Sequence, residues 1–194
     1  MFVLTADQRG SRRGPDRVPD LLDHYSALST VRPLDRTAGD EVQAAFDDAR
    51  TVARLAVELT VTSHWTVGIG AGPVNLPLPA QTRAGSGPAF EAARRAVESA
   101  KGERIPLHVD GDSSWCAQAQ TAAHLLVDLI ASRTDAGREA VALRQRGLSQ
   151  SEAAAALGIS PQAVSLRLRT ARWDLQPPAE ELLVRVLEQT QSAG

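Results

Sequence analysis

The residues with the clearest chemistry lie between positions 160 and 172, in a stretch that predicts a short helix rich in polar and arginine side chains. A glutamine amide donates and accepts hydrogen bonds at once, so Gln162 can pair with an adenine edge through two bonds. Arg167 suits a guanine edge or a phosphate group. We expect the remaining polar side chains of the stretch to contact phosphates. These side chains are Ser160, Ser165, Arg169 and Arg172.

Two aspartates near the N-terminus form a second candidate site. Asp7 follows the first predicted strand, and Asp40 lies in a predicted hairpin turn. If the strand and the hairpin are neighbours, the two carboxylates can converge and hold Mg²⁺ together with nucleotide phosphates. Backbone N–H groups and charge at Gly10, Ser11 and Arg12 could cradle such a phosphate. Aspartate is also an ordinary turn residue, so solvation of two turns is the alternative interpretation.

Signals for two crossed helices surround the arginine-rich stretch. Ser149 begins a helix, and Glu152 stands at the third helical position, as a capping box requires. Gly158 supplies a turn residue that accepts a positive φ without steric cost. Ser160, followed by Pro161, then caps and opens the next helix. The pattern predicts a helix-turn-helix, preceded by a further helix over 138–146.

The charge and the apolar spacing of this segment support the same prediction. From Arg133 to Trp173 the chain has seven arginines and three acidic residues, whereas the whole chain has a net charge of −2. A locally basic segment in a mildly acidic chain is typical of a DNA-binding module. Val164 and Leu168 are four residues apart and are expected to pack on Ala154. A three-helix packing unit without a DNA ligand is the alternative.

The residues ahead of this segment predict an α+β fold. Strand and helix signals alternate in the order strand, helix, strand, strand, helix, strand, helix, strand, which contains the split βαβ pattern of ferredoxin-like folds with an antiparallel sheet. We therefore expect a ferredoxin-like domain over 1–112, a connecting helix over 113–132 and an all-α helix-turn-helix domain over 133–194. The predicted elements are 2–6, 16–28, 31–36, 42–46, 47–62, 65–71, 88–101 and 105–109.

Composition excludes several classes of protein. The chain has 194 residues, of which 43% are hydrophobic and 23% charged, as in soluble globular proteins. No apolar run approaches the roughly 20 residues that span a bilayer. The first residues lack the basic lead of a signal peptide, so we expect a cytoplasmic protein. The single cysteine, Cys116, excludes an internal disulfide.

One segment resembles the helix-turn-helix of bacterial sigma-factor region 4. The segment runs from Leu148 to Arg169 and reads LSQSEAAAALGISPQAVSLRLR. The resemblance implies a second helix that reads the major groove. It does not imply sigma activity, because the rest of a sigma factor is absent.

Segments of the first 94 residues resemble, in order, the motifs of class III nucleotide cyclases. By this resemblance Asp7 and Asp40 match the two metal-binding aspartates of that family. Arg36 stands where the family often has a base-selecting lysine, and Arg94 stands at its transition-state arginine. The segments are ADQRGS (6–11), RTAGD (36–40), VGIGAGPV (67–74) and AFEAAR (89–94).

The chain also departs from the cyclase pattern at two positions. Phe90 replaces an asparagine that orients the ribose, and Arg83 stands near the place of an acidic base-selecting residue. The resemblance therefore implies a cyclase-like fold that could bind a nucleotide with Mg²⁺, rather than a complete cyclase.

Most of the chain is similar to the SatD family of bacterial proteins, which implies a regulatory, DNA-associated role. We therefore predict a homodimeric, DNA-binding transcriptional regulator with a nucleotide-sensing domain. One alternative is a Mg²⁺-dependent nucleotide cyclase or nucleotidyl transferase, and another is a protein-binding module. Besides the helix-turn-helix, the similarity is carried by LTADQRGSR (4–12), DRTAGDEVQ (35–43) and GPAFEAARR (87–95).

Overall fold

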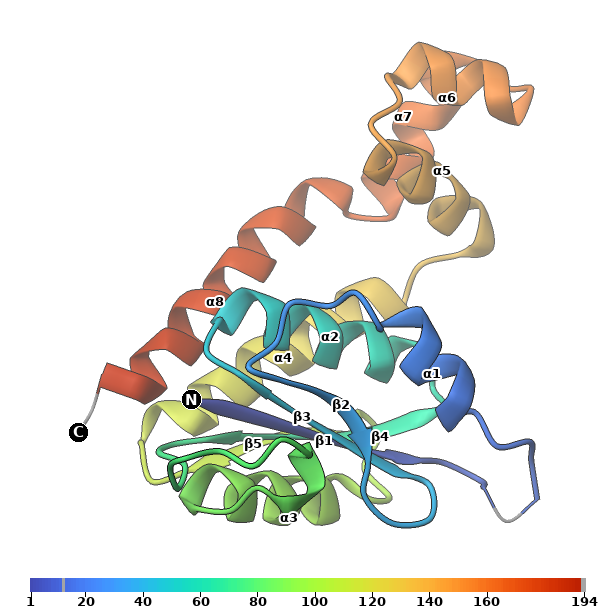
Figure 1. Cartoon of the computed structure of the whole chain (residues 1–194). Coiled ribbons are helices and arrows are strands. Elements are labelled where there is room, and N and C mark those ends of the chain that lie inside the picture. The colour runs from blue at the N-terminus through green and yellow to red at the C-terminus, as the bar shows by residue number, and fades with distance from the viewer. Residues whose placement is uncertain (12, 193–194) are drawn as a thin grey trace.

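The computed structural model describes residues 1–11 and 13–192 and contains a five-stranded sheet with helices on both faces (Figure 1). The predicted phosphate contact Arg12 lies outside the described residues. The strands are β1 (Phe2–Gln8), β2 (Arg32–Arg36), β3 (Glu41–Phe46), β4 (Trp65–Ala71) and β5 (Leu107–Gly111). Across the sheet they lie in the order β2-β3-β1-β4-β5. The prediction of an α+β fold is confirmed.

The sheet is mixed, which corrects the expectation of an antiparallel sheet. β1 is antiparallel to both of its neighbours, β3 and β4, and β2 forms an antiparallel hairpin with β3. β5, however, pairs with β4 in parallel. The reason is the connection between them: helix α3 (Pro88–Ala100) carries the chain back to the start of the sheet, and such a crossover makes the two strands parallel.

Four helices lie on one side of the sheet, with α8 packed on α2 and α4, and α3 covers the other face (Figure 1). Alternate residues of a strand point to opposite faces. In β1, Leu4 and Ala6 belong to the larger apolar cluster, whereas Val3 belongs to the cluster under α3. The four helices of the larger cluster are α1 (Val18–His24), α2 (Ala49–Val61), α4 (Trp115–Ala131) and α8 (Gln176–Ser192).

Two glycines of β4 let α3 lie directly on the sheet. A Cβ atom at Gly68 would lie 2.3 Å from the backbone nitrogen of Val97, and one at Gly70 would lie 2.0 Å from the carbonyl oxygen of Ala89. Gly68 and Gly70, which belong to the segment that the resemblance linked to a cyclase motif, therefore have a packing function here. The intervening Val67 and Ile69 face the larger cluster on the other side.

Helices α5 (Asp135–Gln145), α6 (Gln150–Leu157) and α7 (Pro161–Thr170) share an apolar cluster of their own. Helix α8 does not belong to that cluster, because its Leu183 and Leu187 are buried with α2 and α4. The Gln191 side chain at the end of α8 also donates to the Met1 carbonyl, at 3.1 Å. The predicted 133–194 unit therefore consists of two parts. Helices α5–α7 form a three-helix unit, whereas α8 packs on the sheet body, which is the sheet with α1–α4.

Two short 3-10 turns, 82–84 and 173–175, complete the described elements. Helix α1 is shorter than the predicted 16–28, because the chain leaves the helix at Tyr25. The predicted hairpin between β2 and β3 is present, and Gly39 provides its positive φ of 61°. Among the described residues, no helix is both long and apolar enough to cross a bilayer.

Candidate nucleic-acid interface

Local hydrogen bonds fix the start and the end of α6. The Ser149 hydroxyl accepts from the Glu152 backbone N–H at 3.2 Å, and the Glu152 carboxylate accepts from the Ser149 N–H at 2.7 Å. This is the reciprocal capping box that the sequence predicts. At the other end Gly158 has a φ of 64°, and the next N–H, of Ile159, donates to the Ala154 carbonyl at 3.1 Å. The chain therefore turns sharply after α6.

Capping and packing then set the direction of α7. The Ser160 hydroxyl accepts from the Ala163 N–H at 3.2 Å, and Pro161 occupies the first turn. Val164 and Leu168 are buried in the shared cluster with Ala154, as the sequence predicts. The opposite side of α7 is consequently left outside the cluster.

The outward side of α7 presents a continuous polar stripe. Gln162, Ser165 and Arg169 are exposed and are spaced three to four residues apart, so they line one face of the helix. Leu166, with 53% of its surface exposed, lies in the same stripe. The sequence analysis did not select Leu166. The signal that could have identified Leu166 is its position. It lies four residues after Gln162, on the same side of the helix, and midway between the buried Val164 and Leu168.

Three of the predicted contact residues have other partners. Ser160 caps α7, as described above. Arg167 is only partly exposed and pairs with Glu139 on α5 at 3.3 Å. Arg172 follows α7 with a φ of 51° and donates to the Ser132 hydroxyl at 2.9 Å. The structure thus brings Gln162, Ser165 and Arg169 together and directs Arg167 and Arg172 toward α5 and the end of α4.

The three-helix unit keeps unpaired positive charge at its surface. Of its arginines, Arg138 pairs with Asp135 and Arg167 pairs with Glu139. Other arginines of the unit have no carboxylate partner within the described part of the chain. They include Arg144, Arg146 and Arg169. Positive charge near a polar stripe is what contact with a phosphate backbone needs.

Asp7 lies against a lysine on the α3 face of the sheet. Its carboxylate is 3.5 Å from the Lys101 ammonium group, and its backbone is paired with Glu41 of β3. Burial raises the pKa of Asp7, the Lys101 charge lowers it, and the nearby Asp40 charge raises it again. The Asp7 carboxylate therefore has a cation, Lys101, as its partner.

Asp40 lines a different feature, a cleft of about 380 Å³ beside α1 that does not include Asp7. Ser11 and Arg36 also line this cleft, as the sequence predicts. The Arg36 guanidinium is already paired with Asp16 at 2.6 Å, so the charged groups of the cleft are one arginine and two aspartates. That balance does not favour a phosphate. Within the described residues, no group of three or more histidine, cysteine, aspartate or glutamate side chains could hold a metal ion.

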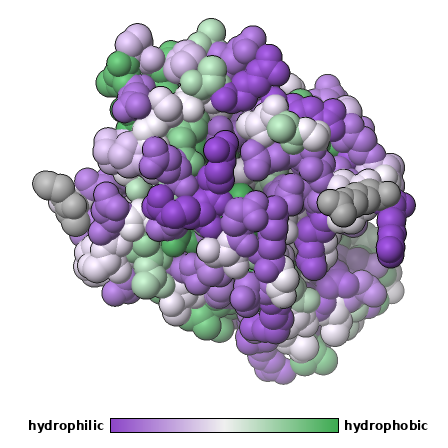
Figure 2. All heavy atoms as spheres, turned by 90° about the horizontal axis from the view of Figure 1, so that it is seen from below, coloured by the Kyte–Doolittle hydropathy of each residue, from purple (hydrophilic) through white to green (hydrophobic). Residues whose placement is uncertain are grey.

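The remaining residues of the cyclase resemblance are also dispersed. Gly10 has a φ of 72° and accepts the Gly14 N–H at 3.0 Å, which closes a turn. Arg94 is exposed on α3, the helix on the face of the sheet seen in Figure 2, where hydrophilic side chains dominate. Phe90 is buried, and a Cβ at Gly85 would lie 2.2 Å from its ring. The aromatic ring at the asparagine position therefore anchors the loop before α3.

The chain matched no family model, no curated protein and no solved structure in the comparisons made. The interface is therefore assigned a function from its geometry and its charge.

Proposed function

We propose that this protein is a DNA-binding transcriptional regulator in which α7 enters the major groove. One observation carries the proposal: α7 is capped and packed on one side while Gln162, Ser165, Leu166 and Arg169 form an exposed stripe on the other. In a helix-turn-helix, the second helix lies in the groove and its early residues contact base edges. The stripe begins one residue after the first position of α7.

Each member of the stripe has a distinct role in the proposal. Gln162 pairs with an adenine edge, and Leu166 contacts a thymine methyl group, because the major groove exposes both features. Ser165 and Arg169 bind phosphates and set the register of the helix on the duplex. Arg144 and Arg146, at the end of α5, add positive charge to the same unit.

The rest of the chain is a ferredoxin-like domain in this proposal. The order β2-β3-β1-β4, with α1 and α2 on one face, supports that arrangement, and β5 extends it. Asp7 lies near Asp40 but is paired with Lys101, and this ammonium group competes with the Mg²⁺ that cyclase or nucleotidyl-transferase chemistry would need. Homodimerisation remains part of the proposal, and it would place two α7 helices about 34 Å apart on one face of a duplex.

Selection from a random duplex pool with the full chain tests the proposal. We expect an enriched motif containing adenine, with two copies about one helical turn apart if the protein is a dimer. Fluorescence anisotropy on that motif and on unrelated duplex then compares two variants. Gln162→Ala should lose preference for the motif, about 1–3 kcal/mol, and keep its affinity for unrelated duplex. Arg169→Ala should weaken both duplexes and reduce the salt slope by about one.

Arg185→Ala is the matched control, because Arg185 is an exposed arginine on α8, away from the three-helix unit. It should leave both affinities unchanged. If the full chain binds no duplex at low salt, or if the α8 variant and the α7 variant lose affinity equally, the regulator proposal fails.

A further inference from the structure

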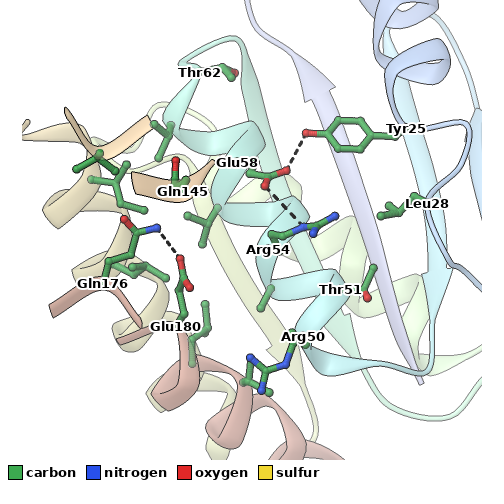
Figure 3. A pocket seen from close by; sticks show the side chains of 18 of the residues that line it. Tyr25, Leu28, Arg50, Thr51, Arg54, Glu58, Thr62, Gln145, Gln176 and Glu180 are labelled. Carbon is green, nitrogen blue, oxygen red and sulfur yellow. Dashed lines mark hydrogen bonds and ion pairs between the residues drawn. The ribbon is translucent and has the colours of Figure 1, made fainter. Parts of the chain in front are cut away.

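A cleft of about 1180 Å³ lies between α5 of the three-helix unit and the helices α2, α4 and α8 of the sheet body. We name it the junction cleft and define it by Val57, Leu126, Arg133, Val141, Gln176 and Leu183, which line it. Figure 3 shows its polar rim, where Glu58 meets both Tyr25 and Arg54. The volume is slightly above the range of about 300–1,000 Å³ that is usual for small-molecule sites.

One arginine in this cleft is buried without a charged partner. Arg133 is 7% exposed, and its Nε donates to the Ala171 carbonyl at 2.9 Å. Its Nη2 is fully covered and has no hydrogen-bond partner among the described residues. A buried cation with an unsatisfied donor is unfavourable unless an anion compensates it. The bond to Ala171 satisfies the Nε donor of Arg133 and leaves the Nη2 donors without a hydrogen bond.

Glu180, an acidic side chain of the cleft whose charge acts on Arg133, has a hydrogen-bond partner of its own. Glu180 accepts from the Gln176 amide nitrogen at 2.6 Å, as Figure 3 shows. Because a carboxylate only accepts, this bond identifies the amide group that faces Glu180 as the nitrogen of Gln176. The amide oxygen of Gln176 is buried and has no hydrogen-bond partner among the described residues. The wall of the cleft therefore carries an unused donor at Arg133 and an unused acceptor at Gln176.

The charge and the apolar surface of the junction cleft define the class of ligand. Its lining has four arginines and two glutamates, and Arg133 is the one of these arginines without an ion pair among the described residues. The other three arginines have carboxylate partners: Arg50 with Glu181, Arg54 with Glu58, and Arg138 with Asp135. Between these rims the wall is aliphatic and includes Val57, Val61, Leu126, Ile130, Val141, Leu183 and Val184.

We propose that the junction cleft binds a small amphipathic carboxylate, whose anionic group pairs with Arg133 Nη2 and whose apolar part lies on the aliphatic wall. Binding requires a small shift of the guanidinium toward the cleft that Arg133 already lines. Ala171 is the C-cap residue of α7, so Arg133 connects the cleft to the end of the recognition helix. Ligand binding and DNA binding are consequently linked, a statement that rests on the proposed function.

Titration of the full chain with three probes of equal chain length tests the site without DNA. The probes are decanoate, decan-1-ol and decylamine, and isothermal titration calorimetry measures their dissociation constants. Because a charge-assisted hydrogen bond to a buried guanidinium is strong, decanoate should bind about tenfold more tightly than the alcohol. Decylamine should bind most weakly. Equal affinity for all three probes, or no binding, would overturn the proposal.

Variants then locate the binding. Arg133→Met should abolish the preference for decanoate over decan-1-ol, and Arg54→Met, at a cleft arginine that already has an ion pair, should preserve it. Since Arg133→Met also loses the bond to α7, Ile130→Trp provides a second variant that fills the cleft and keeps Arg133. It should weaken decanoate and decan-1-ol alike. An unchanged preference in Arg133→Met, or unchanged binding in Ile130→Trp, places the ligand elsewhere.

The regulatory link has its own measurement, the affinity for duplex DNA with and without saturating decanoate. We expect a change of about fivefold or more, which Arg133→Met removes, and an equal change in decanoate affinity on adding DNA. Decanoate binding without any DNA binding would refute the proposed function and leave the site intact. Binding of both without mutual effect would refute only the link.

Discussion

The α6–α7 turn and the strand ends around Asp7 and Asp40 differ in how far apart in the sequence their contacting residues lie. In the turn, Ser149 and Ser160 each bond to a backbone N–H three residues ahead. At the strand ends, Asp7 contacts Lys101, the residue that follows α3, while Asp40 lines a cleft with Ser11 and Arg36. A site built from neighbours in the sequence can be predicted in detail, whereas a site built across a sheet depends on register.

The largest expected effect tests whether long-range contacts dominate the stability of the sheet body. In Gly70→Ala the new Cβ would lie 2.0 Å from the Ala89 carbonyl oxygen, so α3 must move off β4. We expect a loss of about 3 kcal/mol or more in the free energy of unfolding, because overpacking against backbone cannot be relieved by a rotamer change. Urea denaturation followed by circular dichroism measures it.

Gly102→Ala is the control for that variant. Gly102 has a φ of 82° and open space around its Cβ position, so only backbone strain contributes there. We expect about 1 kcal/mol from that strain. Equal losses in the two variants would show that α3 does not need the close approach to β4.

The second prediction tests whether the three-helix unit is stabilised by its own core. Leu168→Ala should destabilise the unit by about 2–4 kcal/mol, because a buried leucine of the α5–α7 cluster leaves a cavity. Trp173 packs against the same cluster, so its fluorescence should change at lower urea concentration than the circular dichroism of the whole chain.

Leu166→Ala is a control on the same helix with the same change of side chain. Leu166 is 53% exposed, so its truncation should alter stability by less than about 0.5 kcal/mol. If both leucines give the same loss, or if one transition describes both probes in Leu168→Ala, the three helices are not an independent cooperative unit.

The predictable parts of the fold are those with local signals. The β4 strand, the capping box at Ser149 and the turn at Gly158 match the structure because propensity and capping act within a few residues. The parallel pairing of β5 with β4 was not predicted, because no residue pattern within 105–109 indicates the direction of the strand relative to its neighbour. The junction cleft was not predicted either, because residues from α1 to α8 line it.

The third prediction concerns the local turn itself. Gly158 has a φ of 64° and no atom within 4 Å of its Cβ position, so Gly158→Ala introduces backbone strain without a clash. We expect a loss of about 1–2 kcal/mol and a parallel loss of DNA affinity, since α7 is reoriented. Gly158→Asn should lose less, because asparagine tolerates the left-handed region. Equal losses for alanine and asparagine would contradict a purely conformational role.

The smallest effect is expected at Asp7, where burial raises the pKa of the carboxyl group above its ordinary value. The folded protein therefore binds more protons than the unfolded chain in that pH window, and stability falls as pH rises from about 4 through the raised pKa. Asp7→Asn removes this dependence. It should match the wild type near pH 3 and exceed it by less than about 1 kcal/mol at pH 7, since the ion pair with Lys101 offsets part of the gain.

The same variant tests whether Asp7 and Asp40 share a metal ion in solution. Because the Lys101 ammonium group already pairs with Asp7, millimolar Mg²⁺ should leave the melting temperature of the wild type and of Asp7→Asn equally unchanged. A melting temperature that rises with Mg²⁺ and loses this rise in both Asp7→Asn and Asp40→Asn would mean that the two side chains share an ion. In that case the pairing of β1 with β3 would be enough to build the site, as the sequence analysis expects, and the contrast with the α6–α7 turn would disappear.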